Sequence, residues 1–271
     1  VGTDIAIANK ESLVAGGHLL MPLAKKKDVN ILPIDSEHNA IYQCMMGHHW
    51  DDVENVTLTA SGGPFLSMTR EEMYHIAPVK ALRHPTWNMG AKISIDSATM
   101  MNKGLESIEA AWLFDIGRDK VSAVIHPQSI IHGFVKFKDE TIISHMAPAD
   151  MKVPISYALG WPERLKIQTE KLDLMQISGL EFMEINNEQF PCYDLAHQLI
   201  GEEPCYAVAL NAANEIAVSL YLENKLAFGD IYLLCNKTVN MIEIRSLYDY
   251  QSVIDYDSFA RDIARSIVLS L

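Results

Sequence analysis

The sequence predicts a mixed α/β protein that ends in a small helical bundle, and three observations support this prediction. Short apolar runs alternate with segments of helical periodicity from residue 4 to residue 114. Residues 129–137 and 141–145 are strand-like runs on either side of the turn 138–140, which indicates a hairpin in a sheet. From residue 192 onward only helical periodicity remains, which is typical of a bundle.

The individual elements follow from local patterns. Short apolar runs predict strands at residues 4–8, 29–34, 53–59, 92–95, 121–126, 129–137 and 141–145. Helical periodicity predicts helices at residues 10–27, 37–46, 69–77, 98–114, 192–200, 206–224, 228–244 and 256–271. The helix at 69–77 opens with a capping-box-like T-x-E-E, and Gly104 is the weak point of the helix at 98–114. Residues 161–190 lack a regular pattern and are predicted to form a connecting arm.

Composition sets limits on the class of protein. The 271 residues suggest about two domains, and 49% hydrophobic with 21% charged residues is the balance of a folded chain. A formal charge of −13 disfavours nucleic acid and anionic membrane surfaces as partners. The four cysteines form no C-x-x-C pair, no signal peptide is evident, and no apolar run reaches the length of a spanning helix. We therefore expect a cytoplasmic protein, and because the sequence starts directly in a strand-like run we expect further chain upstream.

Two carboxylates follow a predicted strand. Asp35 and Glu37 stand where the chain leaves the strand at 29–34, and ligands of α/β proteins gather beyond the carboxyl ends of strands. Oxygen ligands suit Mg²⁺ or Mn²⁺. The alternative is an ordinary acidic pair that is solvated or that caps the next helix, and the pair alone favours that alternative.

Three further segments carry candidate binding groups. Ser61 with two glycines after a strand can cradle a phosphate, although such a stretch is also a common turn. Ser97 is expected at the start of the helix 98–114, and Asn102 and Glu106 share one face of it beside Lys103; the alternative is an exposed polar stripe. The loop 84–90 carries large apolar groups that either close over a ligand or pack in the core. The histidines at 48, 49, 126, 132 and 145 show no metal-ligand spacing and are interpreted as structural or surface groups.

Six segments, taken in this order, closely resemble one enzyme family. They are residues 8–14 (ANKESLV), 33–41 (PIDSEHNAI), 60–65 (ASGGPF), 84–106 (from HP to GLE), 125–132 (IHPQSIIH) and 209–216 (ALNAANEI). Together they resemble the 1-deoxy-D-xylulose 5-phosphate reductoisomerases of the non-mevalonate isoprenoid pathway. The resemblance implies a remnant of a Rossmann-type dinucleotide-binding domain at 1–35, a catalytic α/β domain with a mixed sheet at 36–160, the connecting arm at 161–190, and a C-terminal helical domain at 191–271.

The resemblance also implies roles for individual residues. The metal ligands would be Asp35, Glu37 and Glu106, holding Mn²⁺, Mg²⁺ or Co²⁺. The substrate contacts would be Lys10, Ser36, Glu37, Ser61, His84, Ser97, Asn102, Lys103 and Glu106, with Lys10, Lys103 and Glu37 catalytic. The cofactor contacts would be Asn9, Glu11, Met89 and Gly90, with Trp87 in a flap that closes over substrate and NADPH. The partners would be a small sugar phosphate and a second copy of the chain in a homodimer of a bacterial cytoplasmic enzyme.

One departure from the family concerns the cofactor. Members begin with a glycine-rich phosphate loop, G-x-T-G-x-I-G, and no such loop occurs in these 271 residues. We therefore expect this chain to bind metal and substrate phosphate but to reduce nothing appreciably by itself. Two other readings remain: a metal-dependent sugar-phosphate aldolase or isomerase without a redox step, and a dimerising scaffold without catalysis.

Overall fold

The fold begins with a small strand–helix–strand unit. The computed structural model describes residues 2–87 and 89–269. Strands β1 (Ile5–Ile7) and β2 (Ile31–Pro33) pair in parallel, and helix α1 (Lys10–Lys26) connects them. The side chain of Asn9 caps α1 by accepting from the amide of Ser12. This cap places Lys10 in the first turn of α1, directly after the end of β1.

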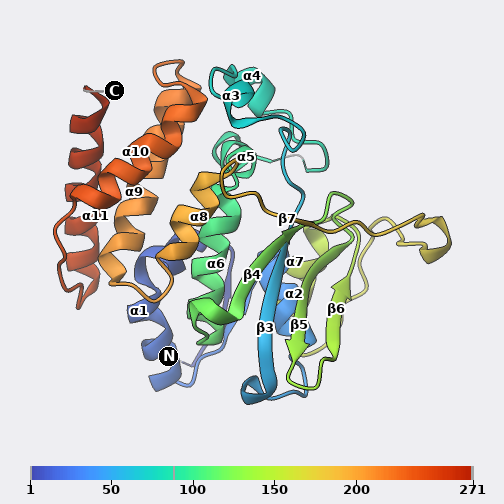
Figure 1. The fold of residues 1–271 in the computed structure, drawn as a ribbon. Coiled ribbons are helices and arrows are strands. Elements are labelled where there is room, and N and C mark those ends of the chain that lie inside the picture. Colours follow the sequence, from blue (N-terminus) through green and yellow to red (C-terminus); the bar gives the residue numbers. More distant parts are fainter. Residues whose placement is uncertain (1, 88, 270–271) are drawn as a thin grey trace.

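A five-stranded mixed sheet forms the second layer (Figure 1). Its strands are β3 (Val53–Ala60), β4 (Val121–Ile125), β5 (Ile131–Phe137), β6 (Ile142–Met146) and β7 (Met183–Glu184), in the order β6-β5-β3-β4-β7. Strands β3 and β4 are parallel and the other pairs are antiparallel. The hairpin predicted from residues 129–145 is confirmed as β5–β6. Helix α2 (Ser36–Cys44) packs against β5, where Gly133 leaves room for the side chain of Ile41.

The chain is helical from Pro191 onward, as predicted, and residues 270–271 of the predicted last helix lie outside the described residues. Helices α8 (Pro191–Gln198), α9 (Pro204–Leu222), α10 (Phe228–Met241) and α11 (Tyr250–Val268) pack beside α1 and α6 (Met101–Phe114) (Figure 1). Gly104 of α6 is a packing position, because a Cβ there would lie 2.5 Å from the Cβ of Ala196 on α8. Within the described residues, α9 is the one helix long and apolar enough to cross a membrane, yet 67% of its apolar window is buried inside the protein. Packing in the bundle therefore accounts for its composition.

One predicted strand is wrong, and the helix after it starts late. Residues 92–95 belong to helix α5 (Ala91–Ala98), and α6 begins at Met101 rather than at residue 98. The K-I-S-I run alternates like a strand, but Lys92 and Asp96 form an i,i+4 ion pair that only a helix allows. Lys92 also pairs with Glu11 on α1, and this tertiary contact helps to override the short-range pattern.

Several short elements had no clear sequence signal. They are α4 (Pro78–Ala81), α7 (Lys152–Gly160) and three 3₁₀ turns, Trp50–Asp52, Arg118–Lys120 and Leu174–Gln176. Helix α3 (Arg70–Met73), in contrast, falls within the helix predicted at residues 69–77. The capping box predicted at residue 69 is present, with Thr69 and Glu72 bonded reciprocally, although α3 ends sooner than predicted. The mixed α/β class with a helical end is confirmed. The domain boundaries at residues 35, 160 and 190 stay a prediction.

Candidate active site

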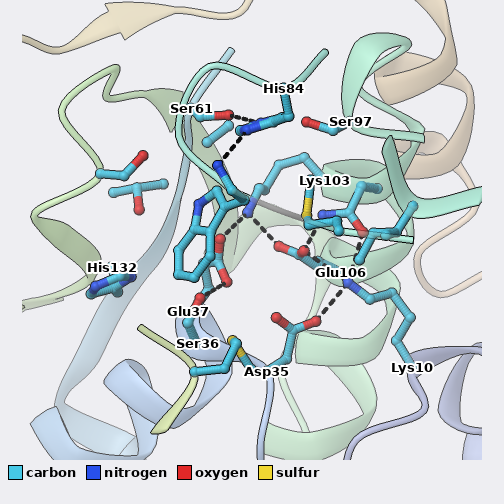
Figure 2. A pocket seen from close by; sticks show the side chains of 18 of the residues that line it. Lys10, Asp35, Ser36, Glu37, Ser61, His84, Ser97, Lys103, Glu106 and His132 are labelled. Atoms are coloured by element: carbon cyan, nitrogen blue, oxygen red, sulfur yellow. Dashed lines mark hydrogen bonds and ion pairs between the residues drawn. The ribbon is translucent and has the colours of Figure 1, made fainter. Parts of the chain in front are cut away.

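The side chains predicted to carry chemistry gather around one cavity of about 250 Å³ (Figure 2). It lies where the start of α1, the ends of β2 and β3, the flap loop (residues 84–90, described except for 88), α5 and α6 come together. The predicted residues that line it are Lys10, Asp35, Ser36, Glu37, Ser61, His84, Trp87, Met89, Ser97, Asn102, Lys103 and Glu106. Segments almost a hundred residues apart in the chain thus share one pocket.

Three carboxylates converge at the floor of this cavity. Asp35 and Glu37 come from the β2–α2 junction and Glu106 from the second turn of α6, and one oxygen of each lies within 4.8 Å of the others. Lys10 Nζ is 2.6 Å from Asp35 Oδ2 and 2.9 Å from Glu106 Oε1. Lys103 Nζ is 2.7 Å from Glu37 Oε1 and also contacts Glu106. Two ammonium groups therefore face three carboxylates, and the cluster carries one excess negative charge when all are ionised.

The pKa values of the cluster reflect this imbalance. Burial, with the neighbouring Glu106 carboxylate, raises the pKa of Glu37 from 4.5 to about 7, against the opposing effect of Lys103. Burial also acts to raise the pKa of Asp35, but Lys10, together with His38 and Lys103, outweighs burial and holds that pKa well below its ordinary value. The pKa of Lys103 is raised although burial lowers it, because Glu106 and Glu37 favour its charged form. The close approach of the three carboxylates and the oxygen atoms that they offer both suit a divalent cation, which prefers carboxylate oxygens.

A second group of potential ligands shares Asp35. Asp35, His38 and Glu109 also bring one ligand atom each within 4.8 Å. His38 and Glu109 are buried behind the cavity, and His38 Nε2 is bonded to the carbonyl oxygen of Glu106 at 2.8 Å. Neither side chain lines the cavity described above. A cation held there would have no open position for a substrate, so the triad with Glu37 and Glu106 is the better metal site.

Hydroxyl and imidazole groups line the opposite wall, as Figure 2 shows for Ser61, His84 and Ser97. Ser61 Oγ lies 2.9 Å from His84 Nε2, and His84 Nδ1 accepts from the amide of Trp87 at 2.9 Å. Gly63 has a φ of +66° and a Cβ there would lie 2.8 Å from the carbonyl oxygen of Ser97. Glycine is therefore required for the β3 loop to approach α5, and the resulting wall of neutral donors suits a phosphate.

The corner between α5 and α6 brings two helices to the same cavity. Ser97 lies in the last turn of α5, so its predicted place at a helix start is wrong, while Asn102 lies in the first turn of α6. Between the helices Met100 adopts the left-handed conformation, with φ 60° and ψ 9°. Thr99 Oγ1 braces the turn by donating to the carbonyl oxygen of Ile95 at 3.1 Å. A continuous stretch of chain thereby lines two walls.

The predicted cofactor residues lie beside the cavity rather than all within it. Met89 lines the cavity itself. Asn9 and Glu11 are joined by a 2.9 Å hydrogen bond and line a neighbouring hollow of about 520 Å³ together with Lys92. Gly90 caps the start of α5. Lys92 was not singled out from the sequence, and its contact with Glu11 over 81 residues gave no local signal.

Two further lining residues were missed as site residues. Ser129 and His132 face the cavity from the segment between β4 and the start of β5, and His132 had been interpreted as structural. His132 Nε2 is bonded to the carbonyl oxygen of Ala147 at 3.2 Å, and burial lowers its pKa. The signal was present, because both residues belong to the 125–132 motif quoted from the sequence.

Comparisons with known proteins agree with one another. A family model described as the 1-deoxy-D-xylulose 5-phosphate reductoisomerase C-terminal domain matches residues 31–114, and one described as the DXP reductoisomerase C-terminal domain matches residues 146–263. The 1-deoxy-D-xylulose 5-phosphate reductoisomerase of Chlorobaculum tepidum is 48% identical over 267 residues, which cover 98% of this chain and 70% of that protein. The same enzyme of Trichlorobacter lovleyi is 45% identical over 270 residues, covering 100% of this chain and 69% of that protein.

Solved structures give the same result. The reductoisomerase from Zymomonas mobilis in complex with NADPH matches with a TM-score of 0.93 and 40% identity, over 99% of this chain and 69% of that one. A DOX-P reductoisomerase in complex with NADPH, fosmidomycin and magnesium matches with a TM-score of 0.91 and 39% identity, over 98% of this chain and 70% of that one. Both matches cover nearly all of this chain.

Proposed function

The chain belongs to the 1-deoxy-D-xylulose 5-phosphate reductoisomerase family, and on that premise we propose how its cavity serves the reaction. In this reaction 1-deoxy-D-xylulose 5-phosphate is rearranged with a divalent metal and reduced by NADPH to 2-C-methyl-D-erythritol 4-phosphate. The single observation that supports this function is that three carboxylates from β2–α2 and α6 meet opposite a wall of phosphate-compatible donors. The sugar phosphate would lie between them.

Asp35, Glu37 and Glu106 are the proposed metal ligands. Their excess negative charge and the raised pKa of Glu37 are relieved by a divalent cation, so the donor set fits one. Magnesium in the related structures supports the same choice. A bound metal supplies Lewis-acid polarisation of the substrate's oxygens.

The two buried lysines are proposed to hold the substrate. Lys10 and Lys103 have pKa values raised by the surrounding carboxylates despite burial, so both stay protonated and donate hydrogen bonds rather than act as bases. Each would turn from a carboxylate toward a substrate oxygen. Glu37 is ionised once the metal is bound and acts on the substrate as a metal ligand, and Ser36 Oγ orients it by donating to Oε2 at 2.6 Å.

The phosphate end of the substrate is proposed to lie against the opposite wall. Ser61 and Ser97 present neutral donors there, and His84 is fixed in place by its bonds to Ser61 and to the flap backbone. Asn102, whose amide donates to Glu106 in this structure, would turn from that carboxylate toward the phosphate. Burial lowers the pKa of His84, so the ring is neutral at physiological pH and acts as a hydrogen-bond partner. Trp87 and Met89 of the flap loop exclude water from the cavity.

NADPH supplies the hydride, and we propose that it approaches from the side of Asn9 and Glu11. These residues line the neighbouring hollow of about 520 Å³ together with Lys92, which follows Gly90 by two residues. The role of this chain is to present the substrate carbon toward that side and to shield it from water. The related structures with NADPH support the assignment.

We further propose that the protein is a cytoplasmic homodimer without nucleic-acid or membrane partners. The arm carries large apolar side chains in solvent, with Leu174 65% and Met175 92% exposed, and Ile142 on the edge strand β6 is 59% exposed. An unpaired sheet edge and an apolar arm suit a second copy of the chain. The net charge of −13 opposes nucleic acid.

The test is substrate binding and turnover with and without metal. Calorimetry should show 1-deoxy-D-xylulose 5-phosphate binding that requires Mn²⁺ and that is lost in Glu106→Gln; binding in the absence of any divalent ion would contradict the proposal. NADPH oxidation by the purified chain tests the separate expectation that it reduces nothing on its own, which full turnover would refute. Product analysis without NADPH separates this function from that of an aldolase or isomerase, and a scaffold would show no metal-dependent substrate binding at all.

A further inference from the structure

Helix α5 has two functional faces. Ile93 and Ser97 line the cavity, while Lys92 and Asp96, one residue earlier in each case, lie on the adjoining face. The helix is only eight residues long and follows directly on the flap loop. The position of α5 therefore determines both the position of Ser97 and the position of the last residue of the flap loop.

A buried polar network fixes the second face of α5. Asp96 is 1% exposed, and Lys92 Nζ lies 2.9 Å from its Oδ2. Lys92 also contacts Glu11 Oε1 on α1 at 2.6 Å. From the C-terminal bundle, Asn214 Nδ2 on α9 donates to Asp96 Oδ1 at 2.8 Å, across 118 residues of sequence. Three parts of the chain, α1, α5 and α9, are thus joined at one carboxylate.

Asn214 belongs to a motif that the proposed function leaves unexplained. It is the second asparagine of the 209–216 segment, it is 0% exposed, and it does not line the cavity. Among the described residues it is the one side chain from the helical bundle that hydrogen-bonds Asp96. Burial acts to raise the pKa of Asp96, and Asn214 and Lys92 oppose that effect by bonding the charged form. An amide at this position is therefore matched to a buried carboxylate.

We propose that Asn214 is a positioning residue, through which the C-terminal helical bundle holds α5, and with it Ser97, against the phosphate end of the substrate. The proposal rests on the proposed function, because Asn214 would affect substrate binding through the position of Ser97 at the proposed phosphate site. Without Asn214, Asp96 is left buried with a bond missing, and α5 can relieve this only by shifting toward water or toward Lys92. Either movement displaces Ser97 but leaves the carboxylates on α2 and α6 in place.

The experiment measures two affinities in Asn214→Ala by calorimetry. The dissociation constant for 1-deoxy-D-xylulose 5-phosphate, with Mn²⁺ saturating, should rise about tenfold, as expected when a buried hydrogen bond to a charged group is removed. The dissociation constant for Mn²⁺ alone should stay within about twofold, because no metal ligand lies on α5. The non-phosphorylated sugar, 1-deoxy-D-xylulose, should bind wild type and variant equally. A residue that merely stabilises the fold would not separate these ligands.

Two further variants complete the test. Asn211→Ala removes a similarly buried amide one turn earlier on α9, whose side chain bonds Glu215 rather than Asp96, and should leave substrate affinity unchanged. The exchange variant Asn214→Asp with Asp96→Asn keeps one donor and one acceptor across the contact and should recover most of the lost affinity. It also covers the case in which Asn214→Ala does not fold.

The outcomes are distinct. Unchanged substrate affinity in Asn214→Ala, an equal loss for Mn²⁺ and substrate, or an exchange variant that folds but binds the substrate no better than Asn214→Ala would each overturn the positioning role. Failure of the wild-type chain to bind substrate with Mn²⁺ would overturn the proposed function itself.

Discussion

Metal affinity should depend steeply on pH between 6 and 8, because one proposed ligand titrates there. Glu37 has a pKa of about 7 in the metal-free protein, set by burial and by the Glu106 carboxylate. A ligand carboxylate must be ionised to bind a cation, so protonation competes with the metal. With this pKa about nine-tenths of Glu37 is ionised at pH 8 and about one-tenth at pH 6. The dissociation constant for Mn²⁺ should therefore rise roughly tenfold from pH 8 to pH 6.

The raised pKa of Glu37 also predicts how the free energy of unfolding depends on pH. The dependence runs opposite to that caused by a carboxylate whose pKa is lowered by a salt bridge. Because the folded pKa of Glu37 lies above its ordinary value of 4.5, the folded state keeps the proton to higher pH than the unfolded chain. Through Glu37 alone, the free energy of unfolding of the metal-free protein should fall by at most about 3 kcal/mol as pH rises from about 4.5 to about 7 and then level off, and Glu109, whose pKa is likewise raised to about 7, adds to the decrease. Saturating Mn²⁺ should abolish the Glu37 contribution and leave that of Glu109.

Calorimetric titration of Mn²⁺ at several pH values, in two buffers of different ionisation enthalpy, measures both the affinity and the protons released. Glu37→Gln should bind Mn²⁺ more weakly and lose the pH dependence. Glu109→Gln is the matched control, since Glu109 also has a pKa raised to about 7 by burial but does not line the cavity. A Mn²⁺ affinity that stays constant from pH 6 to pH 8 in the wild-type chain would refute the reasoning.

Three other predictions concern packing and assembly. Lys103→Met should destabilise the metal-free protein by about 3 kcal/mol in urea unfolding, because it removes the lysine paired with Glu37 and one of the two lysines paired with the buried Glu106, and Mn²⁺ should restore most of the loss. Gly104→Ala should cost about 2 kcal/mol in the same assay, because the added Cβ would lie 2.5 Å from that of Ala196. Met175→Asp, at a side chain 92% exposed, should shift the sedimentation coefficient from dimer to monomer if the arm forms the proposed interface.

Matched controls exist for the packing and assembly variants. Gly16→Ala lies in α1 with nothing within 4 Å of the new Cβ, so it should be neutral or stabilising by up to about 1 kcal/mol. A loss equal to that of Gly104→Ala would show that helix glycines, rather than the contact with α8, set the cost. Met241→Asp, on α10 and 60% exposed, should leave the sedimentation coefficient unchanged. Dissociation by this variant as well would point to a nonspecific effect of charge.

Local patterns predicted most elements, because their signals are short-range. The strands around residues 53–60 and 121–146 are apolar runs, and the C-terminal helices show clear periodicity over many turns. The failure at residues 92–95 has a physical cause. Ile93 and Ile95 alternate with polar residues as in a strand, but helix α5 is fixed by contacts of Lys92 and Asp96 with α1 and α9, which lie far away in sequence.

The candidate site shows the same limit. Asp35 and Glu37 could be noted as an acidic pair, but the sequence pattern alone favours a solvated pair, and their meeting with Glu106 depends on how α6 packs beside α1. The resemblance to the family motifs, rather than the sequence pattern, assigned all three residues to one metal site. His132 was missed because a lone histidine in a strand has no ligand spacing, and Lys92 because its partners are tertiary.

The left-handed residue Met100 lies at the corner between α5 and α6. For the geometry of the pocket, the number of residues at this corner matters more than their identity. Asn102, Lys103 and Glu106 all follow it on one helix, so their directions are set by where that helix begins. Adding or deleting one residue between Thr99 and Met101 would rotate each of them by about 100° around the axis of α6. A substitution at this corner alters one side chain at a time. A single-codon insertion, in contrast, would turn the metal ligand and both of its polar neighbours out of the pocket together.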